Sequence, residues 1–193
     1  MSIIIFTDGS CTNNGQYNAK GGYGIHFPNN EFQDISKEFL IQPITNQRTE
    51  LYGILQAIQI VVENNKYKNI KIYTDSIYSI KCLTKWINQW SKDNWMTKNK
   101  KPVKNLDIIL PIHKLMNKYN ISFNHIRSHT GKKDFFSLCN EKADKLSKSC
   151  YTKPINKTSG GEIKIDLFGD KEYILETPNK TPGNEIKIDL NTI

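Results

Sequence analysis

The sequence predicts an α/β fold in which a five-stranded mixed sheet is flanked by helices. Two observations support this prediction. Three β-rich segments follow one another with short connections, which favours an antiparallel meander. Further strand-like segments then alternate with helical ones, which favours parallel strands. The expected order is three strands, a helix, a strand, helices, a strand and a final helix.

The predicted meander begins at the N-terminus. Residues 3–11 are rich in β-branched and aromatic side chains and end at a turn-rich patch over 12–15, as expected for a strand and its connection. Residues 21–28 and 31–41 also have strand-like sequences. We therefore expect three neighbouring antiparallel strands before the first helix.

A long helix is expected next, from about Gln47 to Asn64. Thr45 or Asn46 can cap its N-terminus, because both side chains accept hydrogen bonds from the first turn. The apolar residues of this segment recur at steps of three and four positions, as on one face of a helix. They are Leu51, Ile54, Leu55, Ile58, Val61 and Val62.

The remaining elements are shorter. Residues 70–75 are expected to form a strand, and Asp75-Ser76 leads into a short helix that ends at about Leu83. A helix over Leu106–Lys118 should kink or start at Pro111, because the proline ring clashes with the carbonyl four residues earlier. The last core strand is expected at 121–126 and the last helix from about Leu138 to Ser149.

Composition places the chain among soluble globular proteins. Of its 193 residues, 37% are hydrophobic and 24% are charged. No apolar run is long enough to span a bilayer, so no membrane association is expected, and no secretion signal is visible. We therefore expect a cytoplasmic or nucleoplasmic protein that is not secreted. The four cysteines have no zinc-site spacing and are expected to be reduced thiols.

Positive charge is concentrated in one segment. The net charge is +8, and residues 81–104 hold seven lysines against one acid, Asp93. Residues 151–193, in contrast, hold six lysines and seven acids. In the basic segment the lysines are interleaved with Trp86, Trp90 and Trp95. Lysines offer charge for phosphates and tryptophans offer flat surfaces for sugars or bases, so this segment favours a nucleic-acid partner.

Three regions are expected along the chain. Residues 1–150 form a catalytic domain, 151–161 have linker composition, and 162–193 form a C-terminal extension of unknown function. The extension contains the string EIKIDL twice, at 162–167 and 185–190. Both copies alternate apolar and charged residues, which indicates short strands. They could pack on the domain or mediate self-association.

Four acids suggest the chemistry. Asp8 shares one strand face with apolar residues, and a carboxylate there is unfavourable unless something compensates it. Glu50 is expected on the core-facing side of its helix, Asp75 ends a strand, and Asp144 lies in the last helix. Clustered carboxylates repel one another unless cations are bound, and oxygen ligands favour Mg²⁺ or Mn²⁺. Two such ions, roughly 3.5–4 Å apart, can generate a hydroxide and stabilise the leaving oxygen at a phosphodiester.

Taken singly, each feature has a simpler interpretation. A strand-end aspartate is more often a helix cap, and a first-turn glutamate usually complements the helix dipole. Tryptophans at four-residue spacing are usually core, and lysine runs are usually solvated. The simpler interpretations weaken when all these features occur together in one chain.

The ordered motifs resemble those of the type 1 ribonucleases H over residues 1–150. Phe6-Thr-Asp-Gly-Ser-Cys11 is similar to the opening strand of that family, and Thr45-Asn-Gln-Arg-Thr-Glu-Leu51 to its second signature. Tyr73-Thr-Asp-Ser76 resembles the third. The lysine–tryptophan segment resembles the basic protrusion of cellular members. His129-Thr-Gly131 and Asn140-Glu-Lys-Ala-Asp144 resemble the last two motifs.

The resemblance implies a ribonuclease H-like fold and an endonuclease that hydrolyses the RNA strand of RNA–DNA hybrids, leaving 5′-phosphate and 3′-hydroxyl ends. It implies two Mg²⁺ ions, with Mn²⁺ as a substitute, bound by Asp8, Glu50, Asp75 and Asp144. His129 would be a further catalytic residue that assists proton transfer or product departure. The 2′-hydroxyls of the RNA would be recognised by Asn14, Asn46 and Gln47, and a DNA phosphate would bind near Thr45 and Asn46. The DNA strand would lie along Tyr78, Trp86 and Trp90. The lysines expected to bind the hybrid are Lys98, Lys100, Lys101 and Lys104.

Two departures from the family pattern leave questions open. The segment between His129 and Asp144 is longer than usual, and Phe135, Phe136 and Leu138 are expected to pack it down. This insertion also makes Asp134 a competitor for the role of Asp144, although the Asn140–Asp144 string favours the latter. The second departure is the C-terminal extension.

Three alternatives remain from the sequence. The first is a nuclease of the same fold that acts on DNA, as resolvases and transposases do. The second is a catalytically silent module that binds hybrids, and the third is a detached fragment of a reverse transcriptase.

Overall fold

A five-stranded mixed sheet with the strand order β3-β2-β1-β4-β5 is the centre of the computed structural model. Strand β1 pairs antiparallel with β2 and parallel with β4, β2 pairs antiparallel with β3, and β4 pairs parallel with β5. This arrangement confirms the predicted three antiparallel strands followed by parallel ones. The strands are β1 (Ser2–Thr12), β2 (Lys20–His26), β3 (Ile35–Phe39), β4 (Asn69–Thr74) and β5 (Asn120–His125).

The structure describes residues 1–128, 131–152, 164–165 and 173–174. The chain divides into one unit over Met1–Pro154 and a second over Ile155–Ile193. In the second unit, β6 (Lys164–Ile165) pairs antiparallel with β7 (Tyr173–Ile174). The second EIKIDL copy and most of the predicted linker lie outside the described residues.

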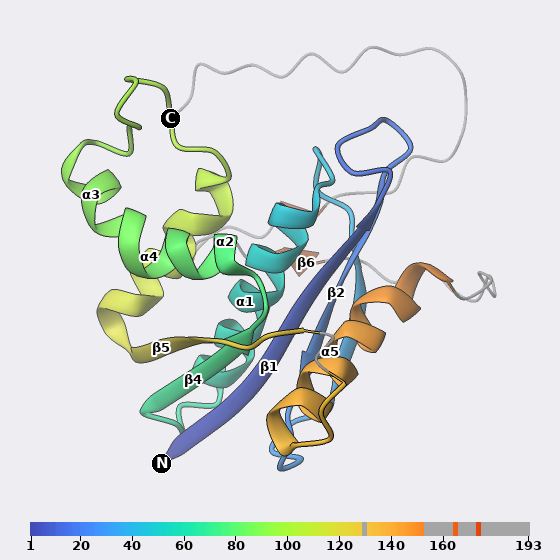
Figure 1. Ribbon diagram of the computed structural model, residues 1–193. Coiled ribbons are helices and arrows are strands. Elements are labelled where there is room, and N and C mark those ends of the chain that lie inside the picture. The colour runs from blue at the N-terminus through green and yellow to red at the C-terminus, as the bar shows by residue number, and fades with distance from the viewer. Residues whose placement is uncertain (129–130, 153–163, 166–172, 175–193) are drawn as a thin grey trace. The chain divides into compact units, whose positions relative to one another are not determined.

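Helices cover both faces of the sheet. Figure 1 shows α1 (Asn46–Glu63) and α4 (Leu106–Lys118) on one side and α5 (Phe135–Thr152) on the other. The larger core fills the space between the sheet and α1, where Ile5, Ile54 and Ile58 are fully buried. A smaller apolar cluster around Phe6 and Ala143 lies under α5. Because β1 contributes to both clusters, its alternating side chains reach both faces of the sheet.

The first helix closely follows the sequence prediction. Thr45 is its N-cap, and the Thr45 hydroxyl accepts a hydrogen bond of 3.3 Å from the Arg48 backbone N–H. The residues that recur at three- and four-residue steps face the core. Arg48 is also buried, and its guanidinium forms a two-pronged ion pair with Asp107 in the first turn of α4, with distances of 2.9 and 2.5 Å.

Several predicted boundaries were wrong. The third strand is shorter than 31–41, because Asp34 accepts hydrogen bonds from His26 and the Phe27 backbone in the preceding turn. The short helix does not end at Leu83. Helix α2 (Ile77–Ile80) continues through a π-helical segment, η1 (Lys81–Trp86), into α3 (Ile87–Lys92).

Helix α4 does not start at Pro111. It begins at Leu106, and the proline lies inside it. Ile108, Ile109 and Ile112 are buried on both sides of the proline, so their packing offsets the lost backbone hydrogen bond.

Helix α5 is longer than predicted at both ends. It starts at Phe135 because Asp134 caps it, accepting hydrogen bonds from the Ser137 backbone N–H and hydroxyl. It runs to Thr152, beyond the predicted end at about Ser149. Phe135 and Phe136 both contact Phe6, as expected for the insertion, whereas Leu138 remains 49% exposed.

Two further predictions concern the described residues. All four cysteines are unpaired thiols. In the part of the chain that the structure describes, no helix has the length and apolar character needed to cross a lipid bilayer.

Candidate active site

The predicted acids meet at one cavity. A cavity of about 730 Å³ opens where β1, α1 and α5 approach the end of β4, and its wall includes all four predicted carboxylates. Asp8, Glu50 and Asp75 each place a carboxylate oxygen within 4.8 Å of the other two. Asp144 lies on the same wall but does not belong to this group, and its carboxylate pairs with Lys148 at 2.5 Å.

A glycine allows the first two acids to approach. Gly9 follows Asp8 on β1, and a Cβ at this position would lie 2.2 Å from the Glu50 backbone nitrogen. A side chain there would separate α1 from β1. The Gly9 backbone also donates a hydrogen bond to Glu50. Residue types at positions 8, 9 and 50 therefore act together to bring one carboxylate from a strand and one from a helix to the same place.

The buried carboxylates are poorly compensated by protein groups. Burial, with the nearby charges of Asp75 and Asp144, raises the pKa of Asp8 from 3.8 to about 7, although a hydrogen bond from Ser147 opposes this shift. Burial and the same kind of repulsion raise the pKa of Glu50 well above its usual value. One Glu50 oxygen, Oε2, is buried without a hydrogen-bond partner.

A divalent cation fits this arrangement. The donors are carboxylate oxygens, which Mg²⁺ and Mn²⁺ prefer. The protein groups around them do not fully compensate the negative charge of these carboxylates. A bound cation would accept the free Glu50 lone pairs and relieve the repulsion that raises both pKa values. Asp8, Glu50 and Asp75 would hold it, with Asp144 beside them.

Helix α5 carries further groups into the cavity wall. Lys148, Tyr151 and Ser10 line it together with the acids. None of these three residues was predicted to belong to the site. Ser10 is two positions from Asp8 on one strand face, and Lys148 is one helical turn after Asp144, so spacing alone could have found both.

The polar residues predicted to contact RNA lie at the start of α1. The Asn14 side chain accepts a hydrogen bond of 2.8 Å from the Asn46 backbone N–H, which holds the loop after β1 against the helix. Asn46 lines the cavity of the acids. Asn14, Asn46 and Gln47 are exposed, and Thr45 is the half-buried cap described above. These four residues are therefore next to one another, and one of them, Asn46, reaches the acidic cavity.

The lysine–tryptophan segment, residues 81–104, forms a second predicted surface. The Trp86 ring contacts the Tyr78 ring edge to face at a centroid distance of 6.1 Å. It also contacts the Trp90 ring, in a tilted arrangement, at 5.7 Å. All three rings are half-buried and pack against the core, so each keeps one accessible part. Asn105 donates a hydrogen bond to the Tyr78 hydroxyl.

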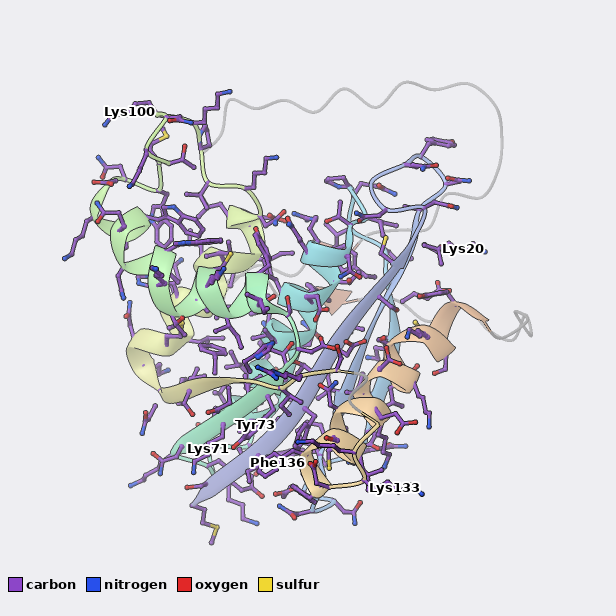
Figure 2. All side chains as sticks on the ribbon, in the orientation of Figure 1. Lys20, Lys71, Tyr73, Lys100, Lys133 and Phe136 are labelled. Atoms are coloured by element: carbon purple, nitrogen blue, oxygen red, sulfur yellow. The ribbon has the colours of Figure 1, made fainter. Side chains whose placement is uncertain are left out.

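The lysines of this segment lie farther out. Lys98, Lys100, Lys101 and Lys104 are all exposed on the loop between α3 and α4. The Met96↔Pro102 bridge and a 2.8 Å hydrogen bond from the Thr97 N–H to the Lys101 carbonyl hold this loop together. Figure 2 shows Lys100 at one end of the view and Lys133, next to the start of α5, at the other.

Two predicted positions need separate mention. His129 lies outside the described residues. Asp134 does not compete with Asp144, because its carboxylate caps α5 and hydrogen bonds from Ser137 lower its pKa.

Comparison with known proteins identifies relatives. The model of the RNase H family matches residues 1–151. A probable ribonuclease H from Acanthamoeba polyphaga mimivirus is 45% identical over 139 residues, covering 70% of this chain and 60% of that protein. A ribonuclease H from Schizosaccharomyces pombe is 35% identical over 145 residues, covering 75% of this chain and 51% of that protein. The chain therefore spans little more than half the length of these two relatives.

Solved structures share the fold. The solution structure of the PFV RNase H domain superposes with a TM-score of 0.61 at 21% identity, covering 76% of this chain and 92% of that domain. At this identity the likeness concerns the arrangement of strands and helices only.

Proposed function

The chain belongs to the RNase H family, and on that premise we propose that it hydrolyses the RNA strand of RNA–DNA hybrids with two divalent cations, giving 5′-phosphate and 3′-hydroxyl ends. The observation that carries this proposal is the convergence of Asp8, Glu50 and Asp75 within 4.8 Å, with Glu50 Oε2 lacking a partner. Such a cluster is unfavourable in a protein that only binds a polyanion, because it repels phosphate.

Each acid has a distinct position in the proposed site. Asp8 and Glu50 are each only 4% exposed, so they form its floor, while the half-buried Asp75 lies at its opening. Mg²⁺, or Mn²⁺ in its place, would supply Lewis acidity at the scissile phosphate and activate water. Asp144 would complete the site, with Lys148 as its partner. His129 would assist proton transfer or product departure.

Strand discrimination would come from the surfaces on either side of this site. Asn46 lines the acidic cavity, Asn14 and Gln47 lie beside Asn46, and all three carry donors and acceptors suited to 2′-hydroxyls, which DNA lacks. Thr45 and Asn46 would contact a DNA phosphate. Tyr78, Trp86 and Trp90 present aromatic edges and faces on which a deoxyribose packs closely, whereas an added hydroxyl would be crowded.

A gel assay tests the activity. A duplex with one labelled RNA strand and one labelled DNA strand is incubated with the full chain in Mg²⁺, in Mn²⁺ and in EDTA. We expect nicks in the RNA strand only, with either ion, and none in EDTA. End mapping should give 5′-phosphates. Cleavage of double-stranded DNA at an equal rate would instead support a same-fold DNA nuclease, and absence of any cleavage would support a binding module.

A further inference from the structure

Ser147 has a fully buried hydroxyl beside the carboxylate cluster. Its residue is 0% exposed, and Ser147 Oγ lies 2.6 Å from Asp8 Oδ2 and 2.8 Å from the Asp144 carbonyl oxygen. A hydroxyl has one proton to donate. The carboxylate is the stronger acceptor and the shorter contact, so we assign the proton to Asp8.

The backbone of Ser147 is held in place from two directions. The Ser10 hydroxyl donates to the Ser147 carbonyl at 2.7 Å, and the Tyr151 hydroxyl donates to Ser10 at 2.8 Å. On the other side, α5 packs directly onto the backbone of β2. A Cβ at Gly24 would lie 2.6 Å from the Ser147 nitrogen, so a larger residue there would push the helix away. The hydroxyl is therefore presented to Asp8 by a rigid support.

We propose that Ser147 is a positioning residue of the metal centre, and that its hydroxyl orients the Asp8 carboxylate toward Glu50 and Asp75. This inference rests on the proposed function. A carboxylate that repels its neighbours will rotate away from them unless another group holds it. Partners of this kind, hydrogen-bonded to a metal ligand, typically change cation affinity by about 10–100-fold when they are removed.

Ser149 is a serine of α5 with a purely structural role. Ser149 lies on the same helix, donates to the Leu146 carbonyl at 3.2 Å and contacts the Ser36 hydroxyl at 2.8 Å. Like Ser147, it lies close to the carbonyl three residues earlier in the helix, but it has no hydrogen bond to any of the four acids. Ser149→Ala is therefore a control on the same helix, since it removes a half-buried hydroxyl from α5 and leaves Asp8 unchanged.

The test is a calorimetric titration of the full chain with Mn²⁺ and then Mg²⁺, without nucleic acid. Ser147→Ala should bind about tenfold more weakly than the wild type, and Ser149→Ala should match the wild type. Ser147→Cys, which keeps a weak donor of similar size, should fall between them. Alanine favours helix, so the variant is expected to fold, which circular dichroism would verify.

A second measurement separates orientation from general damage. In hybrid cleavage, the Mg²⁺ concentration for half-maximal rate should rise about tenfold in Ser147→Ala, whereas KM for the hybrid and the rate at saturating Mg²⁺ should stay near wild type. Equal cation affinity in wild type and Ser147→Ala would overturn the inference and leave the metal centre intact. A wild-type chain that binds neither cation would overturn the proposed function and this inference together.

Discussion

The carboxylate cluster holds buried negative charge, whereas the lysine–tryptophan segment holds exposed positive charge. Asp8 and Glu50 are 4% exposed and their pKa values are raised, whereas the four lysines from Lys98 to Lys104 are exposed to solvent. A buried charge is unfavourable without a partner, so its presence points to a specific ligand. An exposed charge is already solvated, and it attracts a polyanion from a distance without fixing any single contact. We therefore expect chemistry to depend on the first region and affinity on the second.

The largest expected effect is loss of turnover in Asp75→Asn. The amide is nearly the same size as the carboxylate but lacks the charge that would hold a cation, so we expect cleavage to fall by about three orders of magnitude. Hybrid binding in EDTA should stay within about twofold, because the lysines are unchanged. Single-turnover cleavage and fluorescence anisotropy measure the two quantities. Full retention of cleavage would refute the assignment of Asp75.

A smaller effect is expected on the stability of the cation-free protein. Burial and neighbouring acids raise the pKa of Asp8 from 3.8 to about 7, so between these values the folded state binds a proton that the unfolded state has lost. Stability in EDTA should therefore fall as the pH rises from about 4 to 7. Asp8→Asn should reduce this slope, leaving the contribution of Glu50, and stabilise the EDTA-treated chain at pH 8 by on the order of 2 kcal/mol.

Urea unfolding at several pH values measures this stability. The same unfolding experiment is repeated with Mg²⁺, which should stabilise the wild type but not Asp8→Asn. A cation-free wild type whose stability is flat over this pH range would show that Asp8 is better compensated than its surroundings indicate.

The smallest effect is expected from the lysines. Replacing Lys98, Lys100, Lys101 and Lys104 by alanine should weaken hybrid binding by about tenfold at moderate salt and reduce its logarithmic salt dependence by about 2 to 3. The cleavage rate of bound hybrid should change little. The control is the replacement of Lys68 and Lys71 by alanine, which removes two exposed lysines away from this loop and should lower the salt dependence little. An unchanged salt slope in the quadruple variant would exclude a binding role for the loop.

Much of the fold could be predicted because local patterns were strong. The helical spacing from Leu51 to Val62 and the alternation around Asp8 each identified a buried face, and both faces are buried in the structure. The start of α5 was missed although Asp134 and Ser137 form a recognisable cap, because the preceding insertion obscured the helix boundary. The position of Pro111 inside α4 depends on packing against α1, which no local pattern reports.

The candidate site was predictable in composition but not in geometry. The four acids were named from their places in strands and helices, yet the contact between Asp8 and Glu50 depends on Gly9, where two distant segments touch. Ser147 could not be singled out, since many serines occur in helices and only tertiary packing aims this one at a carboxylate. Lys148 could have been predicted from its four-residue spacing to Asp144 alone.

The ion pair between Arg48 and Asp107 constrains how this molecule could be redesigned. Asp107 directly follows the basic loop, while Arg48 is 5% exposed and lies two residues before Glu50. An engineer who grafts a shorter connection between α3 and α4 would have to retain the aspartate. Without it, the buried guanidinium of Arg48, on the same helix as Glu50, would lose its carboxylate partner, and the start of that helix would be destabilised.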